Sequence, residues 1–203
     1  MGVLNFLGFG QNKPDVGALY SRIVGRTRHA VFYTQAGVPD TIDGRFDLLV
    51  LHVHIILRDF RRRGLGRHPL GQALFDAFFQ DMDQGMREAG VGDLGVSKKI
   101  RKMAEAFYGR AGAYDEVLGD GIADPTCSDQ LAKALAKNFS LTADADMTED
   151  IKATNAAEAS EAADAAKYKP LADYAILLET ELSNMEWDAI QAGQFLEAKV
   201  SFK

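Results

Sequence analysis

Apolar residues recur at intervals of three and four along most of the chain, which is the spacing of amphipathic helices. Residues 72–90 show it most clearly, because large apolar side chains share one face and polar side chains share the other. The apolar set is Leu74, Phe75, Phe78, Phe79, Met82 and Met86. The same spacing predicts helices from residue 16 to about residue 37, and over residues 96–108, 131–139 and 171–185. We therefore predict an all-α fold, a compact domain of about six to seven helices with an acidic C-terminal region.

Residues 46–64 form the one segment whose pattern fits two structures. Val50, Val53 and Ile55 are β-branched and would suit a buried strand. A stretch of roughly 20 residues without a turn residue is too long for an ordinary strand and suits a buried helix. Gly64 would end that helix, after arginines that interact favourably with the negative end of the helix dipole. We predict a helix here.

The sequence GVGDLGVSKK at residues 90–99 contains a G-x-G-x-x-G pattern, which holds a phosphate in dinucleotide-binding proteins. Such a loop needs a strand before it, whereas a helix is predicted there. A P-loop would need Gly-Lys-Ser/Thr, and the last glycine here is not followed by lysine. The preferred interpretation is a link in which Gly90 and Gly92 end one helix and Asp93 or Ser97 caps the next. A nucleotide- or anion-binding enzyme that uses this loop is the alternative.

Metal and catalytic chemistry find little support in the sequence. His52 and His54 would lie about 200° apart on a helix, so they cannot chelate one ion, and we expect one packed and one exposed histidine. Cys127 is the single cysteine, which excludes an intramolecular disulfide. No G-x-S-x-G nucleophile motif is present. We predict no catalytic residue, no metal site and no cofactor.

Charge is unevenly distributed along the chain, whose net charge is -6. Residues 1–44 carry 4 basic and 3 acidic side chains, residues 45–110 carry 12 and 8, and residues 111–203 carry 7 and 18. We expect either that the acidic end folds back on the basic middle or that the middle meets an anionic partner. The basic residues would form a solvated rim or a surface for ribosomal RNA, anionic lipid or an acidic partner. They are Arg58, Arg61, Arg62, Arg63, Arg67, Lys98, Lys99, Arg101 and Lys102.

The longest apolar run, residues 48–57, is about half the length needed to cross a bilayer, and the N-terminus lacks the features of a secretory signal. We expect a cytoplasmic protein that is either free or peripheral at the inner membrane. The chain divides into a flexible N-terminal segment at 1–13 and a helical domain at 14–141. An acidic, alanine-rich helix or linker follows at 142–170, and residues 171–203 form a C-terminal helix and tail that pack on the main domain.

Two stretches and the spacing between them carry a specific resemblance. They are AVFYTQAGVPDTIDGRFDLLVLHVHIILRDFRR and QALFDAFFQDMDQGMREAGVGDLGVSKKIRKMAEAFYGRAGAYD. From about Leu19 to Leu135 the chain resembles the ubiquinol-cytochrome c chaperone family, the assembly factors of the cytochrome bc1 complex, and within it the bacterial branch. The resemblance implies a helical protein without catalytic activity that binds newly made cytochrome b, or another bc1 subunit, until haem and partner subunits join. It also implies contact with the ribosome or the inner-membrane surface, and with a small partner protein or a second copy of the chain.

The family supplies no catalytic residues, but its motifs mark an expected partner-binding surface. The positions are Asp43, Gly44, Arg45, Phe46, Asp47, Gly92, Asp93, Leu94, Gly95, Lys98, Lys99, Phe107 and Tyr108. Phe78, Phe79, Met82, Met86 and Met103, with the last two aromatic residues of that set, would line a groove for an apolar client or belong to the core. We favour the core. The acidic residues 142–167 match nothing in the family.

Overall fold

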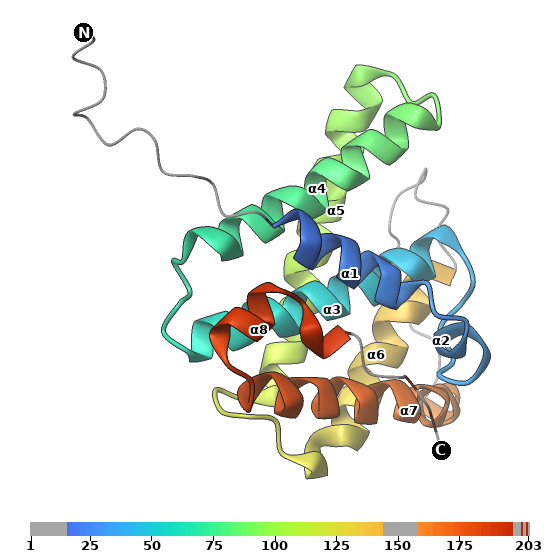
Figure 1. Cartoon of the computed structure of the whole chain (residues 1–203). Coiled ribbons are helices and arrows are strands. Elements are labelled where there is room, and N and C mark those ends of the chain that lie inside the picture. Colours follow the sequence, from blue (N-terminus) through green and yellow to red (C-terminus); the bar gives the residue numbers. More distant parts are fainter. Residues whose placement is uncertain (1–15, 144–157, 197–199, 201, 203) are drawn as a thin grey trace, which may run out of the picture.

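The computed structural model describes residues 16–143 and 158–196 together with Val200 and Phe202. All regular structure in these residues is helical (Figure 1), which confirms the predicted all-α class. The expected flexible segment at 1–13 and the acidic stretch at 144–157 lie outside the described residues. The helices are α1 (Gly17–Thr27), α2 (Val31–Thr34), α3 (Ile42–Arg62), α4 (Pro69–Glu88), α5 (Asp93–Leu118), α6 (Ser128–Ala143), α7 (Glu158–Ser183) and α8 (Trp187–Gln191), with 3-10 turns at Pro125–Cys127 and Gln194–Leu196.

Helix α3 is the centre of the fold, since it packs against α1, α4, α5, α6 and α7. Its apolar side chains are buried on every side of the helix, and even its two histidines are buried. From Phe46 to Phe60 every residue except Leu57 is buried, so this part of the helix has no solvent-facing side, and its apolar run with β-branched residues suits a buried strand equally well. The predicted helix over residues 46–64 is confirmed, and Gly64 follows it with a left-handed φ of +74°.

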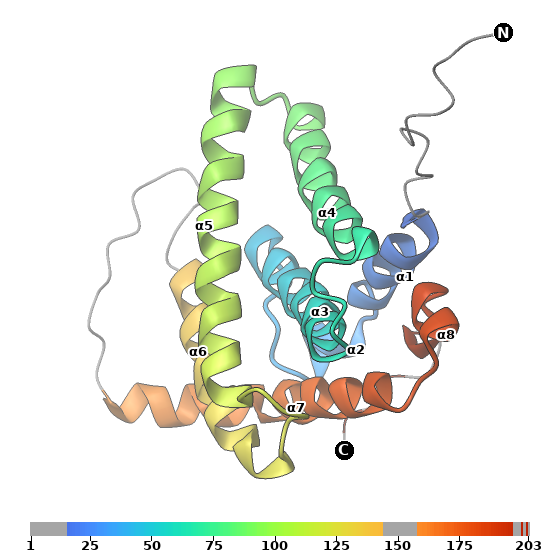
Figure 2. The ribbon, with the colours of Figure 1, turned by 90° about the vertical axis from the view of Figure 1, so that its left-hand side faces the viewer.

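Helices α4 and α5 form a hairpin that projects from the body of the molecule (Figures 1 and 2). The turn between them is the glycine-rich link. Gly90 adopts a φ of +83°, which glycine tolerates without strain. Gly92 is the N-cap of α5, so the expectation that Asp93 or Ser97 caps this helix is wrong. Asp93 is instead the first helical residue, and its carboxylate accepts a hydrogen bond from Arg87.

The first predicted helix is two helices, because α1 ends at Thr27 and α2 begins at Val31. The Tyr33 hydroxyl donates a hydrogen bond of 2.7 Å to the Thr27 carbonyl oxygen. A side chain of α2 thereby satisfies a carbonyl that a continuing helix would have bonded. A regular apolar spacing cannot reveal such a break.

The described C-terminal part of the chain folds back on the basic middle. This was the first of the two arrangements expected from the charge distribution. Helix α7 packs on α6 and α3 across the base of the molecule (Figure 2). Glu179 of α7 is fully buried against Arg58 and Arg62 of α3. The helix runs without interruption from Glu158 through Pro170, so the expected boundary at residue 170 falls inside α7.

Candidate functional site

Most of the arginine run at the end of α3 belongs to the interior. Arg58 is buried and donates from Nε to Glu179 at 2.9 Å and from Nη1 to Asp115 at 3.1 Å. Its Nη2 donates to the carbonyl oxygens of Leu118 and Gly121 at 3.1 and 2.7 Å. Arg58 therefore ties α3 to α5, to the loop after α5 and to α7.

Arg62 and Arg63 extend this network along α3. Arg62 donates to Glu179 and to Asp59, and Arg63 donates to Asp59 at 2.7 Å. Arg63 also donates to two carbonyl oxygens at and just after the end of α7. The expectation of a solvated rim or binding surface is therefore wrong for Arg58, Arg62 and Arg63, because buried carboxylates from other turns and helices hold them inside the fold. Sequence spacing cannot show those partners.

The lysine-rich turn of α5 does not join these arginines in one surface. Asp115, which contacts the arginines, lies 17 residues after Lys98 on the same helix. At about 1.5 Å per residue the two sites are roughly 25 Å apart. The basic middle of the chain thus divides into an internal arginine network and a separate group of lysines near the hairpin end.

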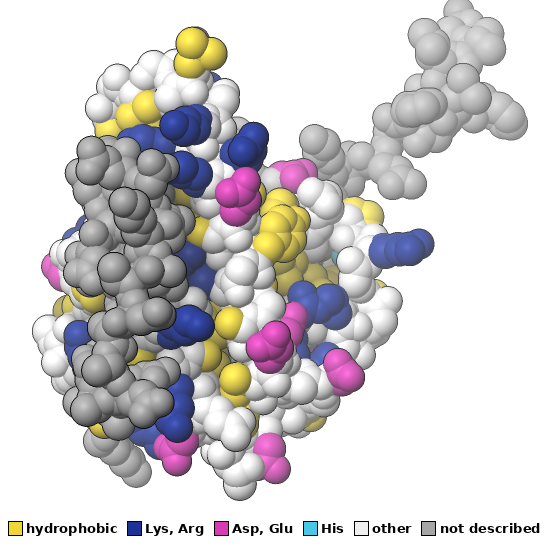
Figure 3. Space-filling view, turned by 180° about the vertical axis from the view of Figure 1, so that it is seen from behind, with side chains coloured by type: hydrophobic (Ala, Val, Ile, Leu, Met, Phe, Trp, Pro, Cys, Tyr) yellow, Lys and Arg dark blue, Asp and Glu magenta, His cyan; other side chains and the backbone are white. Residues whose placement is uncertain are grey.

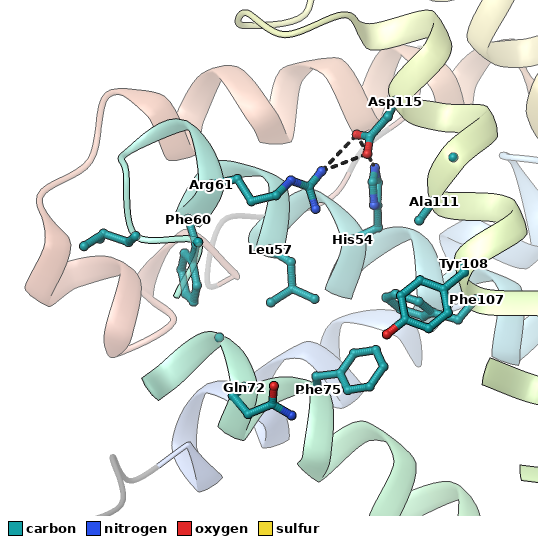
Figure 4. A pocket seen from close by; sticks show the side chains of 14 residues that line it. His54, Leu57, Phe60, Arg61, Gln72, Phe75, Phe107, Tyr108, Ala111 and Asp115 are labelled. Carbon is teal, nitrogen blue, oxygen red and sulfur yellow. Dashed lines mark hydrogen bonds and ion pairs between the residues drawn. The ribbon is translucent and has the colours of Figure 1, made fainter. Parts of the chain in front are cut away.

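A pocket of about 550 Å³ opens between α3, α4 and α5, and we call it the α3–α4–α5 pocket. Phe75, Phe107 and Tyr108 form its aromatic end, whereas Arg61 and Asp115 stand at the opposite, charged end (Figure 4). The ring centroids of Phe75 and Phe107 are 5.3 Å apart in an edge-to-face arrangement, and those of Phe75 and Tyr108 are 5.9 Å apart. Tyr108 is 63% exposed, so one wall of the pocket is accessible to a partner.

Apart from Gln72 and His54, the remaining wall of the pocket is apolar or lacks side chains. Leu57 lies between the two ends (Figure 4). Several wall residues have small side chains or none, which allows the backbone of a partner to come close. They are Gly66, Gly71, Ala111 and Gly112. A Cβ added at Gly112 would meet no atom within 4 Å, so the space beside it is open.

Asp115 lies in a positive environment. Arg61 donates from Nη2 to both carboxylate oxygens at 3.0 and 2.9 Å, Arg58 donates to one of them, and His54 Nε2 lies 3.2 Å from Oδ1. Partial burial alone would raise the pKa of Asp115, but these neighbours outweigh it and lower the pKa to about 2. The carboxylate is therefore ionised at neutral pH.

Both histidines of α3 are buried, so the expectation that one is exposed is wrong. His52 Nδ1 donates to the Leu48 carbonyl oxygen at 2.8 Å, since a carbonyl can only accept, and Nε2 accepts from the Tyr174 hydroxyl at 2.8 Å. Arg26 donates to the same hydroxyl at 3.1 Å. Burial lowers the pKa of His52 to about 4 and Arg26 adds to the shift, while the hydrogen bond to Leu48 opposes it. This group is a structural link between α1, α3 and α7.

The expected binding residues at 43–47 lie in the first turns of α3. Gly44 is buried, and its amide donates a hydrogen bond of 3.0 Å to Oγ1 of Thr41, which is the N-cap residue of the helix. A Cβ at Gly44 would come within 2.1 Å of the Pro39 carbonyl oxygen, so this glycine is required by backbone contact. Arg45 is exposed and pairs with Asp40 at 2.7 Å.

Phe46 and Asp47, the next two residues of that motif, are buried in the interior of the protein. Asp47 is fully buried, and one of its oxygens lies 2.6 Å from Arg110 Nε. The Phe46 ring packs against Phe78 with centroids 5.9 Å apart and lies under the Arg110 guanidinium. Such side chains position α3 against α5 rather than present themselves to a partner.

The binding residues expected at the hairpin end are more accessible. Leu94 is 92% exposed, Lys98 is exposed and Lys99 is half-buried. Figure 3 shows hydrophobic atoms at the end of the projecting hairpin, with Lys and Arg side chains gathered below them. Gly92 and Gly95 shape this turn, and a Cβ at the latter would lie 3.0 Å from a Val91 methyl group.

The expected core set is mixed in its exposure. Phe78, Met103 and Phe107 are buried, as a core assignment requires. Phe79, Met82 and Met86 pack only partly buried against that core, and Tyr108 is 63% exposed, so the core assignment is wrong for Tyr108. The pocket residue Asp115 was missed by the sequence analysis, although a signal exists. It lies seven residues after Tyr108 and three after Gly112, which places all three on one face of α5.

A membrane-spanning helix and a metal site are both absent from the part of the chain that the structure describes. No helix in this part of the chain is both long and apolar enough to span a bilayer. Residues 16–143 and 158–196 bring together no group of three or more histidine, cysteine or acidic side chains that could hold a metal ion.

Comparison with known proteins identifies relatives. The sequence profile of the ubiquinol-cytochrome c chaperone family matches residues 34–199. Ubiquinol-cytochrome-c reductase complex assembly factor 1 of Xenopus laevis is 25% identical over 118 residues, which cover 57% of this chain and 59% of the relative. The human protein of the same name is 27% identical over 123 residues, covering 59% of this chain and 41% of the relative. The chain thus spans less than two thirds of the length of these curated relatives.

A solved structure extends the likeness to the fold. The crystal structure of the Cbp3 homolog from Brucella abortus superposes with a TM-score of 0.63 at 30% sequence identity. The match covers 93% of this chain and 88% of that one. The helical arrangement described above is therefore shared almost from end to end.

Proposed function

Because the chain belongs to the ubiquinol-cytochrome c chaperone family, we propose that it is a non-enzymatic assembly chaperone of the cytochrome bc1 complex. The observation that carries the proposal is the family match over residues 34–199, joined to relatives whose names describe assembly of ubiquinol-cytochrome c reductase. The client is newly made cytochrome b or another subunit of the complex. The protein acts by binding, and its site needs apolar contact surface rather than a reacting group.

The surface available for that client lies on α4 and α5. Exposed Tyr108 and the α3–α4–α5 pocket offer an apolar contact, and Leu94 offers a second one at the hairpin end. A client subunit with membrane-spanning helices exposes apolar surface before assembly, and a helical groove can cover it. Of the expected surface residues, Leu94, Lys98 and Tyr108 on α5 are exposed and Lys99 is half-buried, which supports a role in client contact.

The gene-deletion test has a clear expected result. Removing the gene from the organism that encodes this chain should lower the amount of assembled bc1 complex and of cytochrome b, while cytochrome b transcript stays constant. Complementation with the intact gene should restore both. Unchanged amounts of assembled complex in the deletion strain would contradict the proposal. A pull-down from membranes with the tagged chain, read by mass spectrometry, would name the client.

An adaptor to the ribosome or to the inner-membrane surface is a second candidate, favoured by the lysines of α5. Lys98, Lys99 and Lys102 form no ion pair within the part of the chain that the structure describes. Binding that depends on such lysines weakens steeply with salt, because counterions compete for an anionic partner. Replacing the three lysines by serine should remove salt-dependent binding to ribosomes or anionic vesicles. The nucleotide-binding alternative has less support, since the glycines join two helices and an aspartate stands in the first turn of α5.

A further inference from the structure

We infer that the α3–α4–α5 pocket selects one kind of client segment, an apolar helix that carries an acidic side chain beside its apolar anchor residue. The inference rests on the proposed function and names the substrate class that the chaperone would recognise. It follows from the two unlike ends of the pocket, one aromatic and one charged (Figure 4).

The aromatic end accounts for the apolar anchor. Phe75 and Phe107 are held edge to face, and Tyr108 closes the wall while 63% of it stays exposed. An aromatic side chain so exposed gains from a partner that covers it, because burial removes apolar surface from water. Gly112, beside which no atom lies within 4 Å of an added Cβ, lets the backbone of a helix approach closely. A volume of about 550 Å³ is in the range of ligand pockets and accepts an aromatic or aliphatic anchor.

The charged end accounts for the acidic side chain, because the network around it holds one more cation than anion. Its cations are Arg58, Arg61, Arg62 and Arg63, and its anions are Asp59, Asp115 and Glu179. Three of these arginines are 24% exposed or less and are held by internal carboxylates. The surplus charge therefore reaches solvent at Arg61, which is 47% exposed and lines the pocket.

Arg61 also has donors that its described contacts leave unused, and it is the most exposed arginine of this network. Its described contacts engage only Nη2, which bonds both oxygens of Asp115. Nε and Nη1 are therefore available to an incoming carboxylate, and a guanidinium suits that geometry. The low pKa of Asp115 agrees with a positive field at this end. Of two exposed acids near the aromatic residues in the sequence, Asp76 accepts a hydrogen bond from Gln72 and Glu105 pairs with Arg101. A basic client residue would find Arg61 repulsive, whereas an acidic one would complete the network.

A pair of peptides tests the inference on the full chain. Both are acetylated and amidated Leu/Ala helices of about 16 residues with one Phe, and they differ only in Glu or Lys four residues after that Phe. Fluorescence anisotropy at low salt should show the Glu peptide binding about fivefold more tightly, the value of an ion pair of about 1 kcal/mol. R61E should invert the preference, and R61M, which is the milder change, should abolish it. Y108A should weaken both peptides alike.

Arg87→Glu is the matched control, because Arg87 is 48% exposed against 47% for Arg61 and also pairs with an aspartate, but it lies near the end of α4 and does not line the pocket. It should leave the preference as it is. Equal affinity of the wild-type chain for both peptides, or an unchanged preference in R61E and R61M, would overturn the inference. The inference would also be overturned if the protein co-sedimented with phosphatidylglycerol vesicles but bound the two peptides equally. That result would indicate a lipid ligand. Loss of bc1 complex in the deletion strain alongside equal peptide affinities would refute the pocket's selectivity and leave the proposed function standing.

Discussion

Replacing Arg58 by methionine should destabilise the protein by about 3–5 kcal/mol, the usual effect of breaking a buried ion pair from one side. Methionine keeps most of the apolar stem but removes the guanidinium. Buried Glu179 then loses one of its two arginine partners, and the carbonyl oxygens of Leu118 and Gly121 lose their donor. Typical domains have only about 5–15 kcal/mol of stability, so the loss should be large but measurable.

Urea denaturation followed by circular dichroism is the assay. With a slope near 2.5 kcal/mol/M, the midpoint of R58M should fall by about 1.5 M. R61M is the control, because Arg61 shares Asp115 as a partner but is 47% exposed, and its midpoint should change by less than about 0.4 M. Adding Glu179→Leu to R58M should lower the urea midpoint by less than the sum of the two single changes, because it removes the buried carboxylate that has lost its Arg58 partner. Equal midpoints for R58M and R61M would refute the assignment of Arg58 to the interior.

Three further outcomes are expected. The pKa of His52 is about 4 in the folded protein and 6.5 when the side chain is exposed. As pH falls from 6.5 to 4, only the unfolded chain takes up this proton, so the free energy of unfolding should drop by up to about 3 kcal/mol. His52→Gln should flatten the dependence of the urea midpoint on pH over this range. Gly44→Ala should prevent normal folding, because the added Cβ would lie 2.1 Å from the Pro39 carbonyl oxygen. Gly85→Ala, in mid-helix with open space beside it, should raise the thermal midpoint by the equivalent of about 0.5–1 kcal/mol. Comparable thermal midpoints for the two variants would contradict the backbone contact at Gly44. Leu94→Ser combined with Lys98→Ser should leave the urea midpoint within about 0.5 kcal/mol but reduce client recovery in a pull-down, and undiminished recovery would remove the hairpin end from the client surface.

Apolar periodicity was sufficient for the helices that pack on one side. Residues 72–90 bury one face against the core, so their pattern predicted α4 directly. The buried helix α3 needed an argument from length, because neighbours on every side had removed its polar face. The break between α1 and α2 escaped prediction, since it depends on the hydroxyl of Tyr33 reaching Thr27.

The candidate site divides along the same line. Residue spacing was enough to predict the helical class and the turn at the hairpin end, and two long motifs carried the family resemblance. The tertiary structure decided which charges are internal, because a carboxylate such as Glu179 lies 121 positions from Arg58 and only folding brings them within 2.9 Å. The tertiary structure also distinguished Arg61 from the adjacent arginines, which the sequence alone does not separate. Successive residues of a helix point in different directions, so the Arg61 guanidinium faces the pocket whereas those of Arg62 and Arg63 contact internal partners. Local spacing specifies a helix and its faces, whereas partners distant in sequence determine what each face meets.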